Sequence, residues 1–380
     1  MQNLVCSYNQ SCFRQKAPQS LASNSNRSLI LGRRYLFSLD LDSCEQEEEV
    51  ELDYPLKNPR MTTRVLGSCN GLLCISNSDE EILLWNPSIR RHHEVPFTPI
   101  EFPVRLLRSD LRHMFYGFGY DPTTDDYKLI RVVEFYDDDD YPYSCDSEVK
   151  VYSLCTNSWR RILDMPYYLT CHCYYGVLAN YALHWVAMRK TGPDTTSSFI
   201  VSFELRDEEY REVPLPDYVG DGFYMNLGVL GGQLCLLRIF SKVGVEVWVM
   251  KDYGVRDSWV KQSSLEQSAV IWPFCCIRPI CYTKNGEVIL DKYTADKAPL
   301  ILYDPRSRSV WNIRLCDARD RNGAEICIGS LLLLDTKDGA QQTAMKKRQS
   351  WFLSLTGVFL EMWCCSEDDE DGSGKFKGRT

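Results

Sequence analysis

Three short stretches of the 380-residue chain contain residue types that could bind an ion or a charged partner. Residues 171–173 read Cys-His-Cys, which are zinc-ligand types. Residues 90–93 read Arg-Arg-His-His and could hold an anion, and residues 136–143 place four aspartates among tyrosines. Each stretch also has a simpler explanation, because charged residues in proteins usually lie at solvated surfaces.

The Cys-His-Cys stretch does not predict a metal site. Adjacent strand residues point to opposite faces, so these three side chains cannot converge on one ion. The pairs Cys275-Cys276 and Cys364-Cys365 fail for similar reasons, and no Cys-x-x-Cys spacing occurs. We therefore expect no metal and no cofactor. The basic stretch at 90–93 is best explained as the charged edge of a hairpin.

Residues 136–143 are the best candidate for a protein-binding loop. Aromatic side chains supply contact area, and an acidic block selects a basic partner. A solvated loop between two strands is the alternative, because runs of like charge are usually solvated. The candidate partner-binding residues are Tyr136, Asp137, Asp138, Asp139, Asp140, Tyr141 and Tyr143.

Composition and motifs exclude several function classes. The net charge of −9 disfavours nucleic-acid binding, which depends on Lys and Arg. The apolar runs at 326–334 and 351–365 are too short to cross a membrane, which takes about 20 residues. The five histidines lie in no nucleophile motif, and no phosphate-binding loop is present. Seventeen cysteines without a signal peptide indicate free thiols, so we expect a cytoplasmic or nuclear protein.

The elements that position these residues are short strands separated by Gly, Pro, Asn and Asp. Five segments share one pattern, in which an apolar strand is followed by a polar turn and a second strand. They begin at Glu81, Glu148, Phe199, Val245 and Pro299. In four of them an aromatic residue opens the second strand: Trp159, Tyr210, Trp259 and Trp311. Residues 117–132 form a sixth hairpin of the same kind, with Asp-Pro at its tip as in a β-turn.

Further strands begin near glycine at a regular interval. Their starts are spaced by roughly 50 residues, which is the size of one four-stranded propeller blade. These starts are Gly67, Gly117, Gly176, Gly228 and Ile280. The sequence therefore predicts an all-β, propeller-like (kelch-like) array of short antiparallel strands, with irregular N- and C-terminal segments.

Three of these motifs, taken in order, resemble the F-box-associated domain of plant F-box proteins. They are GSCNGLLCIS with LLWNPSIRR, then GFGYDPTTDDYKLIRVV, then EVKVYSLCTNSWRRI. The chain is similar to the immunity-regulating and S-locus members of that group. The motif residues are Gly67, Asn70, Gly71, Trp85, Asn86, Pro87, Gly119, Tyr120, Asp121, Pro122 and Trp159.

The resemblance implies a division of the chain into four parts. Residues 61–335 correspond to the propeller-like domain, and residues 21–60 to a joining segment with short strands and an acidic linker. Residues 1–20 are a divergent N-terminus, in which we expect the F-box to be missing or truncated. Residues 336–380 are a divergent, partly acidic tail.

The resemblance also implies a non-catalytic function. Such proteins recognise the protein substrate of an SCF-type cullin-RING ubiquitin ligase. Their F-box docks on the Skp1-type adaptor of that ligase, so the adaptor and the cullin are expected partners if an F-box is present. A chain without an F-box would instead be an interaction module that binds the same clients without delivering them. An enzymatic propeller of the galactose-oxidase or glycosidase kind is disfavoured, because it needs metal ligands or paired carboxylates.

Overall fold

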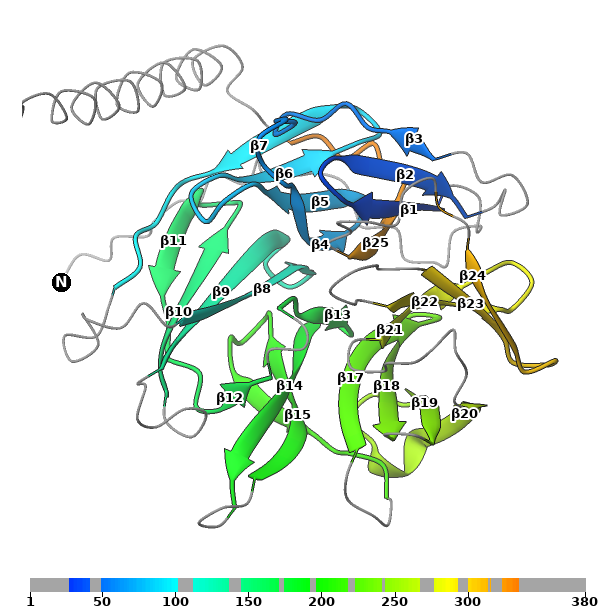
Figure 1. Ribbon diagram of the computed structural model, residues 1–380. Coiled ribbons are helices and arrows are strands. Elements are labelled where there is room, and N and C mark those ends of the chain that lie inside the picture. The colour runs from blue at the N-terminus through cyan, green and yellow to red at the C-terminus, as the bar shows by residue number, and fades with distance from the viewer. Residues whose placement is uncertain are drawn as a thin grey trace, which may run out of the picture. The chain divides into compact units, whose positions relative to one another are not determined.

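The fold is six antiparallel β-sheets arranged as the blades of a propeller (Figure 1). The computed structural model describes residues 27–41, 49–101, 112–136, 145–170, 174–191, 196–217, 223–240, 243–266, 277–292, 300–313, 315 and 323–334. One 3-10 turn, η2 (Arg256–Ser258), accompanies the strands in this part of the chain. The predicted all-β propeller is therefore confirmed. Among the described residues, no helix has the length and apolar character needed to span a membrane.

We number the blades I to VI in chain order and give their strands from the centre outward. Blade I contains β25 (Ala324–Ile328), β1 (Arg27–Gly32), β2 (Leu36–Asp40) and β3 (Val50–Glu51). Blade II contains β4 (Arg64–Cys69), β5 (Leu72–Ser76), β6 (Ile82–Asn86) and β7 (Arg91–Val95). Blade III contains β8 (Arg112–Asp121), β9 (Asp126–Tyr136), β10 (Cys145–Ser153) and β11 (Ser158–Arg161).

The other three blades repeat the arrangement. Blade IV contains β12 (Tyr168–Leu169) and β13 (Val177–Ala179), which both pair with β14 (Ala182–Lys190), then β15 (Thr196–Glu204) and β16 (Tyr210–Val213). Blade V contains β17 (Phe223–Leu230), β18 (Gln233–Phe240), β19 (Gly244–Met250) and β20 (Trp259–Glu266). Blade VI contains β21 (Ile277–Tyr282), β22 (Val288–Lys292), β23 (Leu300–Asp304) and β24 (Ser309–Ile313).

The predicted strand starts at roughly 50-residue intervals are the innermost strands of five blades, namely β4, β8, β13, β17 and β21. The five predicted hairpins with a common pattern are the outer hairpins of blades II to VI. The sixth, residues 117–132, is different in position, because β8 and β9 are the two inner strands of blade III. Its sequence resembles the others because it uses the same turn.

The ring closes by pairing two segments from opposite ends of the described chain. β25 pairs antiparallel with β1, from Arg27 opposite Ile328 to Leu31 opposite Ala324. β25 then serves as the innermost strand of blade I and contacts both β4 and β21. Part of the range 21–60, which we expected to join two modules, therefore builds a blade of the propeller.

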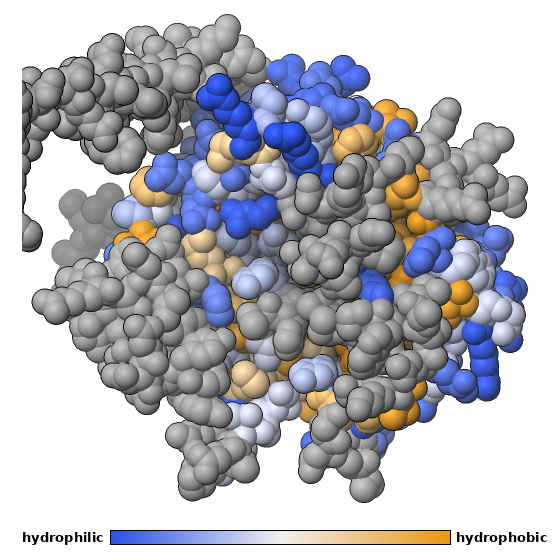
Figure 2. Space-filling view, viewed as in Figure 1, coloured by the Kyte–Doolittle hydropathy of each residue, from blue (hydrophilic) through white to orange (hydrophobic). Residues whose placement is uncertain are grey.

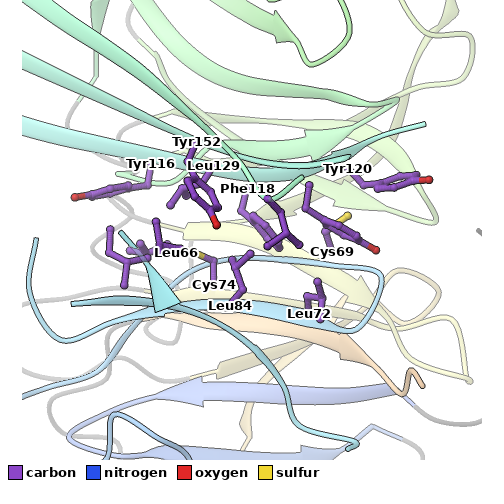
Figure 3. Close-up of a cluster of buried hydrophobic side chains, with 14 of the residues drawn as sticks. Leu66, Cys69, Leu72, Cys74, Leu84, Tyr116, Phe118, Tyr120, Leu129 and Tyr152 are labelled. Carbon is purple, nitrogen blue, oxygen red and sulfur yellow. The ribbon is translucent and has the colours of Figure 1, made fainter. Parts of the chain in front are cut away.

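The cores lie between neighbouring blades. One cluster of buried side chains unites Leu66, Cys74 and Leu84 of blade II with Phe118 and Tyr152 of blade III (Figure 3). Burying one large apolar side chain contributes roughly 1.5–3 kcal/mol, so each interface is a substantial source of stability. Burial also raises the pKa of the Cys69 thiol to about 12, which marks this cysteine as a packing group.

Candidate interaction site

The hairpins define two ends of the ring, because antiparallel strands place alternate connections on opposite sides. One end, here called the turn face, carries the tight turns within the inner and outer hairpins, such as 70–71, 87–90 and 122–125. The other end, the connector face, carries the loops between second and third strands and the connections between blades. The strands on either side of the expected binding loop, β9 and β10, end and begin at the connector face, where Tyr136 pairs with Cys145.

The turns of blade II hold the segment that follows β25. The Asn86 side-chain amide donates to the carbonyl oxygens of Ser330 (3.1 Å) and Leu332 (2.9 Å). The Asn86 Oδ1 accepts from the Ser88 backbone N–H, which is the turn chemistry expected before Pro87. The Ser88 hydroxyl in turn accepts from the Ser330 N–H (3.1 Å). This segment, residues 329–334, is here called the strap.

Gly71 lies in the turn between β4 and β5 of the same blade, directly against the strap. Its φ is +83°, and a Cβ there would lie 2.3 Å from the Ser330 Cβ and 2.5 Å from the Ile328 carbonyl oxygen. Asn70 also has a positive φ and donates to the Tyr127 hydroxyl (3.2 Å). The Asn-Gly turn is thus required by its own backbone and by the approach of the strap.

Trp85 and Gly67 pack blade II against its surroundings. The Trp85 ring is buried, with its centroid 6.0 Å from that of Tyr54. A Cβ at Gly67 would lie 3.0 Å from the Cβ of Phe118, so this glycine sets the close approach of blades II and III. Both residues therefore have a packing role.

In blade III, Asp121 organises the turn after β8. Its carboxylate accepts from the Thr123 N–H (2.8 Å) and the Thr124 hydroxyl (2.7 Å) and lies 3.2 Å from the Lys128 ammonium. Burial alone would raise the Asp121 pKa, but the bonds from Thr124, Thr123 and Lys128 outweigh it and lower the pKa. Lys128 also donates to the Leu205 carbonyl oxygen, which ties blade III to blade IV.

Three further motif residues complete this turn. The Tyr120 hydroxyl donates to the Asp125 carboxylate (2.5 Å), and Pro122 occupies the second turn position. A Cβ at Gly119 would lie 2.7 Å from methyl carbons of both Leu178 and Leu205. Gly119 therefore sets the close approach of blades III and IV, whereas Tyr120 and Pro122 shape the turn.

The aromatic residues that open outer strands form a repeated latch. Trp159 Nε1 donates to the Pro96 carbonyl oxygen (2.7 Å), just after the last strand of the preceding blade. Trp259 Nε1 makes the equivalent bond to Pro214 (2.8 Å), and the Tyr210 hydroxyl makes it to Leu163 (3.1 Å). Each latch ties one blade to the chain leaving its predecessor.

The basic stretch 90–93 does not converge on a ligand. Arg90 has a φ of +55° at the hairpin tip, and both it and Arg91 are exposed. His93 is buried, with Nε2 2.9 Å from the Tyr152 hydroxyl and 3.1 Å from the Asn157 Oδ1. Arg90 and Arg91 are thus exposed while His93 is buried, as expected for the charged edge of a hairpin.

Comparison with known proteins identifies the family. Residues 25–336 match the model of the F-box associated beta propeller domain. The chain belongs to this family. It is 37% identical over 320 residues to the F-box protein CPR1 of Arabidopsis thaliana, covering 80% of this chain and 76% of that protein. It is 31% identical over 336 residues to the Arabidopsis thaliana F-box protein At4g22390, covering 84% and 81%.

The expected binding loop lies almost entirely outside the described residues of this F-box associated propeller. Tyr136 is the last residue of β9, and its backbone pairs with Cys145 at the start of β10. Asp137 to Tyr143 lie outside the described residues, as do Cys171, His172 and Cys173. Within the described part of the chain, no three His, Cys, Asp or Glu side chains could jointly hold a metal ion.

The propeller also exposes groups that the sequence patterns did not single out. Tyr181 is 58% exposed on the turn face, and the strap residues Leu331 and Leu333 are also exposed. Figure 2 shows hydrophilic and hydrophobic residues interspersed over the described part of the face in view. The turn between β13 and β14 has Asn-Tyr at residues 180–181, where a two-residue hairpin turn usually has Asn-Gly. In the sequence, only this unusual turn residue could have drawn attention to Tyr181.

Proposed function

We propose that this chain is the substrate-recognition component of an SCF-type cullin-RING ubiquitin ligase. The observation that carries the proposal is membership of the F-box associated propeller family over residues 25–336, together with F-box proteins as its relatives. The chain would bind a client protein without catalysing a reaction itself. It would act in the cytoplasm or nucleus, which a fluorescent fusion in plant cells would test.

The closed ring supports this proposal as a binding platform. Pairing of β25 with β1, the strap and the latches hold the blades in a fixed arrangement. Loops carried by a rigid scaffold are the usual place for binding residues. We assign client binding first to the loop 136–143 of the connector face, where tyrosines would supply contact area and aspartates would select a basic client surface.

Two measurements test the proposal. Co-purification of the full chain with a Skp1-type adaptor tests attachment to the ligase, and the client's half-life in cells with and without the chain tests delivery. A longer half-life of the client in cells that lack the chain supports the proposal. Client binding without adaptor binding or any change in half-life would instead favour the interaction module.

The loop assignment has its own test. Replacing Tyr136, Tyr141 and Tyr143 by Ala, or Asp137 to Asp140 by Asn, should weaken client binding at least tenfold and leave thermal stability unchanged. Neutralising Asp252 and Asp257, which lie between β19 and β20, is the matched charge control. Unchanged affinity in both loop variants would refute the assignment.

A further inference from the structure

Three blades join their two inner strands by a two-residue turn with the same backbone. The turns are Asn70-Gly71 in blade II, Asn180-Tyr181 in blade IV and Gly231-Gly232 in blade V, and every one of these residues has a positive φ. This is the tight turn that suits the twist of a hairpin, and its second position favours glycine. Blades II and V have glycine there, whereas blade IV has Tyr181 with a φ of +59°.

No hydrogen bond or ring contact of the Tyr181 side chain among the described residues offsets this strain. A bulky L-residue in the left-handed region is disfavoured, and such residues persist where the surroundings impose them or a function needs them. Tyr181 is 58% exposed, and its side chain has no hydrogen-bond or ring partner among the described residues. Its carbonyl oxygen accepts from the Leu205 N–H (3.3 Å), a bond that any residue at this position could make.

We propose that Tyr181 is a second contact residue for the client polypeptide, on the turn face and therefore at the opposite end of the propeller from the ends of β9 and β10. Tyrosine is among the residues that most often dominate the energy of protein interfaces. The Leu205 bond places the tip 205–209 beside Tyr181, and this tip exposes Arg206 and Glu209 as a charged rim. The occupant is a polypeptide that packs an apolar side chain on the ring and polar groups on that rim. The inference rests on the proposed function, because it takes the partner to be a client.

The first experiment separates a binding role from a structural one. Tyr181→Asn keeps a side chain that tolerates the left-handed conformation, and Tyr181→Gly removes the side chain altogether. If the ring serves binding, both variants should unfold at the same temperature as the wild-type chain or higher. A clear fall in the unfolding temperature of both would overturn the proposal, since it would show that the fold uses the ring.

The second experiment measures contact directly. The full chain carries photoreactive benzoylphenylalanine at position 181, or at the control position 224, where Tyr224 is 55% exposed in β17. After irradiation in plant cells, we expect a discrete adduct from position 181. The adduct protein, once purified, should bind Tyr181→Asn at least tenfold more weakly than the wild-type chain, and Tyr224→Asn with unchanged affinity.

Absence of an adduct at position 181, or equal affinity for Tyr181→Asn and wild type, would overturn the proposal. The result is separable from the proposed ligase function. If Tyr181 binds a polypeptide whose half-life does not depend on the chain, delivery to the ligase fails while the contact stands.

Discussion

Asn86 and Ser330 lie 244 positions apart in the chain, and a hydrogen bond of 3.1 Å joins the Asn86 amide to the Ser330 carbonyl oxygen. A second bond from the same amide reaches Leu332. A short turn motif in blade II therefore holds the segment that follows the closing strand. The motif around Asn86 therefore fixes the chain directly after the strand that closes the ring.

Replacing Asn86 by Ala should destabilise the propeller by about 2–3 kcal/mol. The variant loses the two bonds that the amide donates and the bond that Oδ1 accepts from the Ser88 N–H, each worth roughly 1 kcal/mol. Urea denaturation followed by circular dichroism measures the change. Asn312→Ala is the matched control, because Asn312 is exposed on the outer strand β24, and it should change stability by less than about 0.5 kcal/mol.

Gly71→Ala and Gly232→Ala should differ although both glycines have a φ near +80°. Each variant carries the penalty of an L-residue in the left-handed region, about 1–2 kcal/mol. A Cβ at Gly232 meets no atom within 4 Å, whereas one at Gly71 clashes with Ser330 and the Ile328 carbonyl. We expect an extra cost of about 1–3 kcal/mol for Gly71→Ala by chemical denaturation. Equal costs would show that the strap does not pack against Gly71.

Removing the indole N–H donor of a latch should lower the free energy of unfolding of the propeller. Trp259→Phe should cost about 1–1.5 kcal/mol, because Trp259 is buried and its bond to Pro214 is partly buried. Trp159→Phe should cost about 0.5–1 kcal/mol, since its bond to Pro96 is more exposed. Trp311 is 40% exposed, so Trp311→Phe serves as the control and should be close to neutral. Thermal unfolding of the three variants ranks them, and a larger loss for Trp311→Phe would contradict the order.

Stability should fall between pH 6.5 and pH 4 because of His184. Burial lowers the His184 pKa to about 4 from its ordinary value of 6.5, and the ring bonds to the Val177 carbonyl and the Tyr253 hydroxyl. In this range the unfolded histidine binds a proton while the folded one stays neutral. His184 therefore gives its full contribution above pH 6.5, and as the pH falls to 4 it loses on the order of 3 kcal/mol. His184→Gln should show a flatter stability profile over this range, and an unchanged slope would refute the assignment.

Local chemistry explains why so much of the fold was predictable. Asn86 before Pro87 and Asp121 before Pro122 mark turns through bonds to residues two positions away. Such turns mark where strands end and begin along the chain. The order of the strands and the roughly 50-residue spacing of the blades could therefore be inferred without tertiary information. The latch residues Trp159 and Trp259 were also visible as repeated aromatics, although their carbonyl partners were not.

Long-range pairing explains what was missed. β25 pairs with β1, but neither the composition nor the spacing of the two segments indicates that they are partners. Residues 326–334 stood out in the sequence only as an apolar run too short for a membrane, yet they supply the strap. The candidate site was less predictable still, because an exposed residue such as Tyr181 follows no hydrophobic pattern. Only its backbone conformation distinguishes it from other surface tyrosines.

The closure of blade I has a consequence for biosynthesis. β1 is translated before every other described strand, whereas its inner partner β25 is translated after all of them. During elongation on the ribosome, one edge of β1 therefore lacks its native partner while blades II to VI emerge. An unpaired edge is a template for pairing with other chains. Completion of the ring therefore waits for the synthesis of β25, and until then the inner edge of β1 is exposed to pairing with other chains.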